Sequence, residues 1–258
     1  MDHIELLLTR LDDIGRSLAQ TDHALALIGM GSVGQELDRL DAYSDLDFFA
    51  IVEEGYKAAY LYDLDWLSRI APIAYAFQNT ADGYKVLYAD GVFCEFAIFA
   101  PDELVQIDYA PGRLVWGRED FDATLVTPRR ELPARPAPDV DWLVGEAITN
   151  LYVGLGRFRR GEKLSAFRFI QEYAVDRIVE LSDLIASRSR SAEDPFDRSR
   201  RYEQRYPALA ERLSGLMQGY DRSPESAVAI LFLLEEYFPV DPAMKAAILS
   251  LAEDESDR

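Results

Sequence analysis

Two short apolar runs, separated by a glycine-serine turn and a pair of aspartates, place the strongest constraint on this chain. The runs Ala24–Ile28 and Phe48–Val52 have the length and composition of buried strands. Gly31-Ser32 follows the first run, and Asp45-Leu46-Asp47 opens the second. Because side chains alternate along a strand, Asp45 and Asp47 point to the same face. Two neighbouring carboxylates repel each other, so the spacing predicts a compensating cation, for which a divalent metal ion is the usual choice.

The turn at Gly31 and Ser32 predicts a phosphate site, because backbone N–H groups and a hydroxyl can bind phosphate there. A short helix expected over Gln35–Leu40 would join the two strands. The pattern therefore indicates one βαβ-like unit that carries both a metal site and a phosphate site. A lone Asp-x-Asp pair would mean less, since such pairs are common in solvated loops and at helix N-termini.

Composition restricts the class of protein. The 258 residues suffice for one large domain or two smaller ones. No apolar run approaches the ~20 residues of a membrane span, and the acidic start does not read as a signal peptide. The single cysteine excludes an internal disulfide framework. We therefore expect a soluble, cytoplasmic protein without a membrane partner.

The net charge of -19 disfavours long nucleic acids as partners, because their phosphates are bound by many Lys and Arg side chains. Small anions such as nucleoside triphosphates remain compatible, since magnesium and a few local donors can hold them. The same field attracts cationic substrates. The simpler interpretation is that the charge serves solubility.

The N-terminal half mixes helices and strands. Apolar residues at helical spacing predict an amphipathic helix over Ile4–Leu18 and a second helix over Ala58–Ile70. Asp90-Gly91 between the runs Tyr84–Tyr88 and Val92–Phe99 predicts a hairpin.

The C-terminal half is helical. The segment Thr127–Asp139 holds four prolines and indicates a linker. Asp139 or Asp141 can cap the first helix beyond it, and Ser223 suits the start of the fourth. We thus expect an α+β domain over residues 1–135 and an all-helical domain over residues 139–258. The expected helices cover the following ranges: Trp142–Arg160, Ser165–Ser187, Ala208–Gln218, Ser226–Phe238 and Ala243–Leu251.

Glu95 is the only charged residue of the run Val92–Phe99. A carboxylate in so apolar a strand is costly unless it is paired, hydrogen-bonded or bound to metal. Taken alone, it is explained by an edge strand that turns it to solvent. Together with Asp45 and Asp47 it supplies three carboxylates, which on adjacent strands can hold two magnesium ions about 4 Å apart.

These residues resemble the signature of the nucleotidyltransferase superfamily typified by DNA polymerase beta. Gly31-Ser32, a spacer, Asp45-Leu46-Asp47 and the later Glu95 match its Gly-Ser pair, its Asp-x-Asp and its third carboxylate. The two-domain size resembles the branch of lincosamide and aminoglycoside nucleotidyltransferases, which attach a nucleoside monophosphate to an antibiotic hydroxyl. The helices from Trp142 through Glu162 and from Ser165 onward look like the substrate-side domain of the lincosamide enzymes.

The resemblance implies a fold and a set of roles. The fold would be α+β, a small mixed β-sheet domain with flanking helices followed by a helical-bundle domain. Asp45 and Asp47 would bind magnesium, and Gly31 and Ser32 would hold the β- and γ-phosphates of ATP or another nucleoside triphosphate. Glu95 would complete the site of two magnesium ions or act as the base. The chain would be a transferase that releases pyrophosphate, modifies a small-molecule hydroxyl and, with an antibiotic as acceptor, confers resistance.

Several further side chains have two interpretations each. Glu146 could act as the general base in place of Glu95, or simply lie on a helix surface. The arginines of Arg198–Arg205 could bind phosphate or carboxylate, or pair with the acidic surface. Lys57 and Lys85 could approach a triphosphate or be solvated.

The acceptor also has alternatives. Antitoxin-type nucleotidyltransferases modify a protein or an RNA end, and a degenerate relative would bind nucleotide without catalysis. The retained carboxylates argue against the degenerate relative. A homodimer is compatible with the sequence, which does not decide the oligomeric state.

Overall fold

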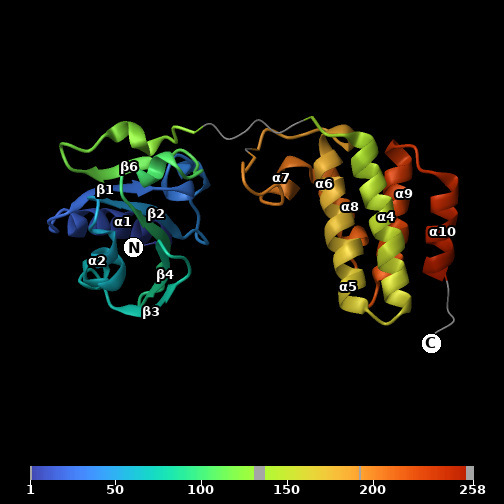
Figure 1. Ribbon diagram of the computed structural model, residues 1–258, viewed down its shortest axis with the longest axis horizontal. Coiled ribbons are helices and arrows are strands. Elements are labelled where there is room, and N and C mark those ends of the chain that lie inside the picture. The colour runs from blue at the N-terminus through green and yellow to red at the C-terminus, as the bar shows by residue number, and fades with distance from the viewer. Residues whose placement is uncertain (1, 131–136, 192, 254–258) are drawn as a thin grey trace. The chain divides into compact units, whose positions relative to one another are not determined.

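The computed structural model describes residues 2–130, 137–191 and 193–253 of the chain (Figure 1). The chain divides into two compact units, Met1–Ala134 and Arg135–Arg258. The predicted linker Thr127–Asp139 falls in part on residues 131–136, which lie outside the described residues.

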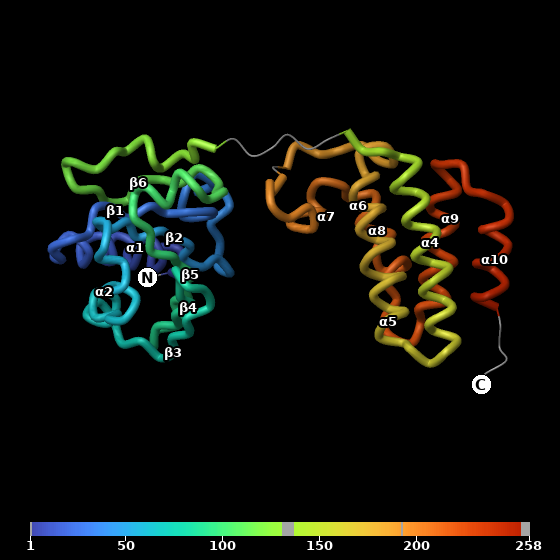
Figure 2. Tube along the Cα trace, in the orientation of Figure 1, coloured from blue at the N-terminus to red at the C-terminus, as the bar shows by residue number. Residues whose placement is uncertain are grey.

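The first unit is built on a six-stranded mixed sheet with the strand order β3-β4-β5-β2-β1-β6 (Figures 1 and 2). Only the central pair, β2 and β5, is parallel, and the other neighbours are antiparallel. The expected α+β class with a mixed sheet is confirmed. The strands span β1 (Ala24–Gly29), β2 (Leu46–Val52), β3 (Ile73–Gln78), β4 (Gly83–Tyr88), β5 (Phe93–Phe99) and β6 (Arg113–Gly117).

The predicted βαβ-like unit is wrong, because β1 and β2 are antiparallel. Their connection needs only to reverse the chain, and it does so with two single-turn 3₁₀ helices, η1 (Gly31–Val33) and η2 (Leu37–Arg39), in place of a helix over Gln35–Leu40. The helical backbone ends at Arg39, because Leu40 is extended, with a φ of -68° and a ψ of 124°.

Helix α1 (His3–Leu18) covers one face of the sheet, as the apolar spacing predicts. It begins with a capping box in which Asp2 and Glu5 exchange hydrogen bonds. Its fully buried side chains join the inward-facing residues of the strands; they are Leu7, Leu11, Ile14 and Leu18.

The helix expected over Ala58–Ile70 is two short helices, α2 (Lys57–Tyr62) and α3 (Asp65–Ser68). The carboxylate of Asp63 accepts a hydrogen bond of 2.9 Å from the backbone N–H of Asp65. Such a local bond competes with the helical pattern and interrupts the helix.

The predicted hairpin is confirmed as β4 and β5. Strands β3 and β6, which no sequence pattern indicated, complete the two edges of the sheet. Strand β3 is exposed along most of its length, with Tyr75 55% and Phe77 52% accessible. An exposed edge strand carries little burial pattern, which explains why its sequence is uninformative.

A smaller cluster packs against the second face of the sheet. It contains Ile28, Phe99 and Tyr109, with Phe49 partly buried against them. Two further 3₁₀ helices, η3 (Glu103–Val105) and η4 (Ala123–Val126), contribute to this cluster. The cluster covers the part of the face next to Phe49 and leaves the start of β2 and β5 half-exposed.

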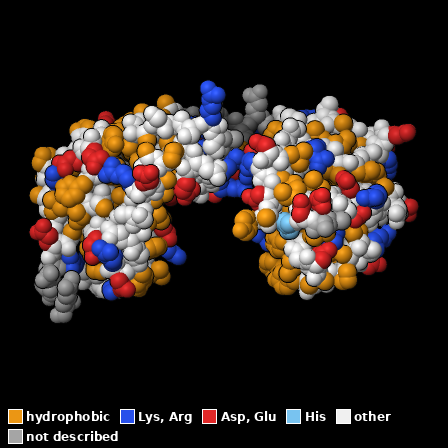
Figure 3. All heavy atoms as spheres, turned by 180° about the vertical axis from the view of Figure 1, so that it is seen from behind, with side chains coloured by type: hydrophobic (Ala, Val, Ile, Leu, Met, Phe, Trp, Pro, Cys, Tyr) orange, Lys and Arg blue, Asp and Glu red, His pale blue; other side chains and the backbone are white. Residues whose placement is uncertain are grey.

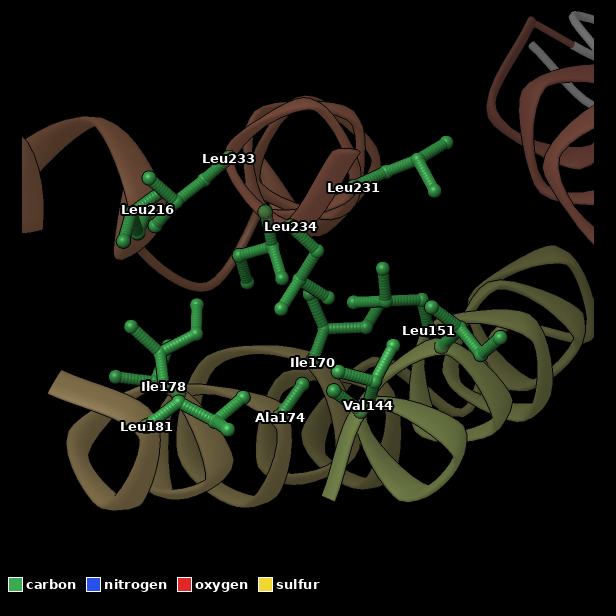
Figure 4. Packing of buried hydrophobic residues seen from close by; sticks show 14 of the residues in the cluster. Val144, Leu151, Ile170, Ala174, Ile178, Leu181, Leu216, Leu231, Leu233 and Leu234 are labelled. Atoms are coloured by element: carbon green, nitrogen blue, oxygen red, sulfur yellow. The ribbon is translucent and has the colours of Figure 1, made fainter. Parts of the chain in front are cut away.

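The second unit is helical, as predicted, and its core is drawn in Figure 4. Asp139 caps α4 by accepting the N–H of Trp142 at 3.0 Å, and α9 begins at Ser223 as expected. The helix expected over Ser165–Ser187 contains a six-residue π-helical segment. The elements are α4 (Val140–Arg159), α5 (Lys163–Phe167), the π-helix η5 (Arg168–Tyr173), α6 (Ala174–Ile185), α7 (Tyr202–Arg205), α8 (Pro207–Leu216), α9 (Ser223–Tyr237) and α10 (Pro242–Glu253).

Acidic and basic side chains are interspersed with apolar atoms over the face in Figure 3. Among the described residues, no helix has the length and apolar character that a membrane crossing needs.

Candidate active site at the start of strands β2 and β5

Asp47 and Glu95 lie directly opposite each other on the parallel strands β2 and β5. Paired residues of neighbouring strands point to the same face of a sheet, so both carboxylates lie on the second, half-exposed face. Asp45 precedes β2 by one residue and is also half-exposed. The structure therefore brings Asp47 and Glu95 together, although they are far apart in sequence.

The turn after β1 is wound so tightly that it tolerates only glycine at two positions. A Cβ atom at Gly34 would lie 2.7 Å from the carbonyl oxygen of Gly29, and one at Gly29 would lie 2.6 Å from that of Val33. Real Cβ atoms do not approach backbone oxygens so closely. The two glycines therefore allow the backbone to fold back on itself.

Gly31 places this turn beside the carboxylate of Asp47. It has a left-handed φ of +52°, and a Cβ atom on it would lie 3.4 Å from Oδ2 of Asp47. The backbone N–H of Met30 donates a hydrogen bond of 2.8 Å to the carbonyl oxygen of Asp47. The turn and the start of β2 are thus fixed to each other.

Arg113 holds the far end of the turn. Its Nε and Nη2 atoms donate to the carbonyl oxygen of Val33 at 3.2 and 3.0 Å. Within the part of the chain that the structure describes, neither the hydroxyl nor the backbone N–H of Ser32 makes a hydrogen bond. Both donors are therefore available to an anion at the turn.

Glu95 is held by two neighbours on its other side. Its Oε2 lies 3.0 Å from Nζ of Lys85, the residue opposite it on β4. Its Oε1 accepts a hydrogen bond of 3.2 Å from the side-chain amide of Asn79. Two acidic side chains, Asp47 and Glu95, and then the basic Lys85 thus form a row across the sheet.

Carboxylate oxygens on Asp45, Asp47 and Glu95 are the donors that magnesium prefers. In this structure, however, the three side chains are not gathered around one point. The described ranges contain no group of three or more His, Cys, Asp or Glu side chains close enough to hold one metal ion. Lys85 and Asn79 hold the carboxylate of Glu95, so a shared ion would require Glu95 to leave them.

The thiol of Cys94, beneath the site, has a pKa that its surroundings change. It is fully buried on the opposite face from Glu95. Burial raises the pKa of its thiol to about 12, and the negative charges of Asp45 and Asp47 add to the rise. The positive charge of Arg10 opposes this rise, and burial outweighs it.

The other candidates occupy different surroundings. Lys57 pairs with Asp82 at 2.7 Å and Glu103 at 2.6 Å, which joins α2 to the turn before β4 and to η3. Glu146 lies half-buried on α4 of the helical unit.

The arginine-rich segment makes structural contacts. Arg200 pairs with Asp194 at 2.9 Å, and Arg205 lies 3.8 Å from Glu193 and donates to the carbonyl oxygen of Arg198. These bonds support the interpretation that the segment pairs with acidic groups.

Sequence reasoning missed three residues of this region: Gly29, Asn79 and Arg113. The Gly29 signal was present, since a glycine ends the first strand two residues before Gly31. Asn79 directly follows β3, and Arg113 begins β6. The sequences of these two strands show no recognisable strand pattern. The two residues could not have been assigned without the sheet order.

Comparisons with known proteins complete this description. No protein-family model matches the chain, and no curated protein matches it either. Among solved structures, it is similar to the crystal structure of an aminoglycoside 6-adenyltransferase from Bacillus subtilis. That similarity covers 93% of this chain and 95% of the other, with 13% sequence identity and a TM-score of 0.39.

Proposed function

We propose that the protein is a magnesium-dependent nucleotidyltransferase that transfers a nucleoside monophosphate, AMP from ATP, to a hydroxyl group of a small molecule. A lincosamide or aminoglycoside antibiotic is the class of acceptor that we favour. The observation that carries the proposal is the register of β2 and β5, which sets Asp47 opposite Glu95 beside the Gly31 turn. The turn with the unbonded donors of Ser32 and the carboxylate pair lie side by side there.

Each residue has a role that follows from its position. The free donors of Ser32 and the open backbone at Gly31 would receive the β- and γ-phosphates. Asp45, Asp47 and Glu95 would hold magnesium, which when bound neutralises the charge that develops on the phosphate oxygens. The acidic surface would attract a cationic acceptor.

The proposed transfer forms one bond, breaks one bond and needs an acceptor for the hydroxyl proton. The acceptor oxygen forms a bond to the α-phosphorus, and the bond from that phosphorus to the bridging oxygen of pyrophosphate breaks. The hydroxyl proton passes to a carboxylate, for which Glu95 is the candidate on the sheet. Holding the two reactants in line supplies much of the acceleration.

Incubation with ATP labelled at the α-phosphate, magnesium and a panel of lincosamides and aminoglycosides tests the proposal. We expect label on one of the small molecules together with release of pyrophosphate. The Asp47→Asn variant should lose transfer by about a hundredfold or more. Unchanged transfer in that variant would contradict the site.

The same assay separates the alternatives. Label on protein or on an RNA end would point to the antitoxin type of enzyme and refute the small-molecule acceptor. Binding of ATP without transfer to any acceptor would favour a non-catalytic relative. Absence of any nucleotide binding would refute the proposal altogether.

A further inference from the structure

A pocket of about 540 Å³ lies in the helical unit, between the end of α4, the start of α5 and the turn before α9. Its volume is within the usual range for small-molecule sites, about 300–1,000 Å³. Basic and aromatic side chains dominate its lining: Arg157, Lys163, Arg168, Phe169, Tyr173 and Tyr220.

The positive charges of the pocket exceed the negative charges that could neutralise them. Lys163 pairs with Asp221 at 2.8 Å, and Glu162, which also lines the pocket, is bonded to Arg160. The side chain of Arg168 makes no ion pair or hydrogen bond to any residue that the structure describes.

Arg157 is oriented without a carboxylate partner. It donates to the hydroxyl of Ser165, and its guanidinium lies 4.2 Å from the centre of the Phe169 ring. Two guanidinium groups without a carboxylate partner, in a chain of net charge -19, form a local site for an anion.

The pocket stands on the π-helical segment η5, which carries Arg168, Phe169 and Tyr173. Such segments are rare and are frequent at functional sites. Gly154 of α4 makes room for η5, because a Cβ atom there would lie 2.5 Å from Cγ1 of Ile170.

A buried glutamine fixes the opposite wall. Gln171 of η5 is fully buried, and its side-chain amide bonds both the N–H and the carbonyl oxygen of Gly219 at 2.8 Å. It also donates to Oγ of Ser223 at 3.0 Å. The turn that carries Tyr220 is therefore held at a set position relative to Arg168.

From these contacts we infer that the pocket binds a small organic phosphate. Its phosphate would lie between Arg157 and Arg168, and its planar body would lie against Tyr173 and Tyr220. The exposed rings of these tyrosines, 43% and 49% accessible, provide the apolar surface. The site belongs to the helical unit alone and does not depend on the proposed transferase activity.

Calorimetric titration of the full chain with phenyl phosphate tests this inference, with inorganic phosphate, phenol and benzoate as comparison probes. We expect phenyl phosphate to bind about tenfold tighter than inorganic phosphate, because the ring adds contact area. The Arg168→Gln variant should lower the affinity for phenyl phosphate by about tenfold, because one charge-assisted contact is lost. Arg222→Gln is the matched control, since it removes an exposed charge beside the turn of Tyr220, and neither Arg222 nor its partner Glu225 lines the pocket.

Each outcome bears on the inference. Tighter binding of benzoate would overturn the assignment to phosphate, and equal binding of inorganic phosphate would overturn the role of the tyrosines. Equal losses in the Arg168→Gln and Arg222→Gln variants would show that only the general charge of the surface matters, and would overturn the pocket as a specific site. Binding that is lost in Ser32→Ala but kept in Arg168→Gln would place the phosphate at the turn after β1 and refute this pocket.

Discussion

The Nζ atom of Lys85 lies 3.0 Å from Oε2 of Glu95. The two residues are directly opposite each other in the hairpin of β4 and β5. Both side chains are about two-fifths exposed, 40% and 43%. An ion pair so open to water adds little to stability, on the order of 0–1 kcal/mol. The position of Glu95 beside Asp47 is the one that the proposed site requires.

We therefore predict that Glu95→Gln lowers nucleotidyl transfer by about a hundredfold or more, because a carboxylate that binds metal or accepts a proton is lost. The free energy of unfolding should change by less than about 1 kcal/mol. Kinetic assays and urea denaturation measure the two effects. Lys85→Gln removes the same ion pair and keeps the carboxylate, so an equal loss of activity in that variant would contradict the role of Glu95.

The turn after β1 makes a second prediction. Gly34→Ala forces a Cβ atom to within 2.7 Å of the Gly29 carbonyl oxygen, so the turn must open. We expect a loss of about 1–3 kcal/mol of stability, together with weaker ATP binding. Gly55→Ala is the control: its φ of +85° is strained, but no atom lies within 4 Å. It should lose about 1–2 kcal/mol and keep ATP binding, and equal ATP affinity in both variants would argue against the turn as a phosphate site.

The buried thiol beneath the site predicts how the first unit responds to alkaline pH. Burial raises the pKa of Cys94 from its usual 9.0 to about 12 and also raises that of Tyr88. The unfolded chain ionises these groups first, so stability is full below pH 9.0 and falls as the pH rises toward 12. Melting temperatures measured across this range should show a shallower decline in Cys94→Ala than in the parent chain.

The same thiol offers an independent readout. Because the thiolate is the reactive form, the raised pKa and the burial should keep Cys94 unreactive toward iodoacetamide in the native protein. It should react rapidly in denaturant. Fast alkylation of the native chain at neutral pH would contradict the burial of this residue.

Two glycines on α4 give a matched pair in the helical unit. Gly156 faces open space, so Gly156→Ala should stabilise the helix by up to about 1 kcal/mol. Gly154 lies against Ile170 of η5, so Gly154→Ala should cost about 1–3 kcal/mol through overpacking. Denaturation curves of the two variants decide this, and equal effects would show that α4 does not pack tightly on the π-helix.

Much of the fold could be predicted from sequence because it depends on burial. The helix α1, the hairpin at Asp90-Gly91 and the helices of the second unit all bury an apolar face that recurs at a regular spacing. The edge strands β3 and β6 bury little, and their sequences carry no such period. The π-helical segment also escaped prediction, since an apolar spacing does not reveal one extra residue in a turn.

The candidate site was predictable in its residues and not in its geometry. Asp45 and Asp47 stand out as a pair that opens an apolar run, and Glu95 as the one charge within another, so all three could be chosen as candidates. That β2 would pair with β5 in parallel, and with β1 in antiparallel orientation, depends on the whole sheet. The ion pair of Glu95 with Lys85 follows from the register of β4 and β5, and no local sequence pattern predicts it.

The parallel pairing of Leu46–Ile51 with Cys94–Phe99 also governs the order in which the sheet can assemble. This pairing closes a loop of about fifty residues, whereas the pairing of β4 with β5 closes a loop of only a few residues. Long loops close more slowly. Glu95 would therefore meet Lys85 early in folding and Asp47 only when the sheet is nearly complete. A partly folded chain would hold the hairpin without an assembled carboxylate pair, so recovery of activity on refolding should lag behind formation of the hairpin.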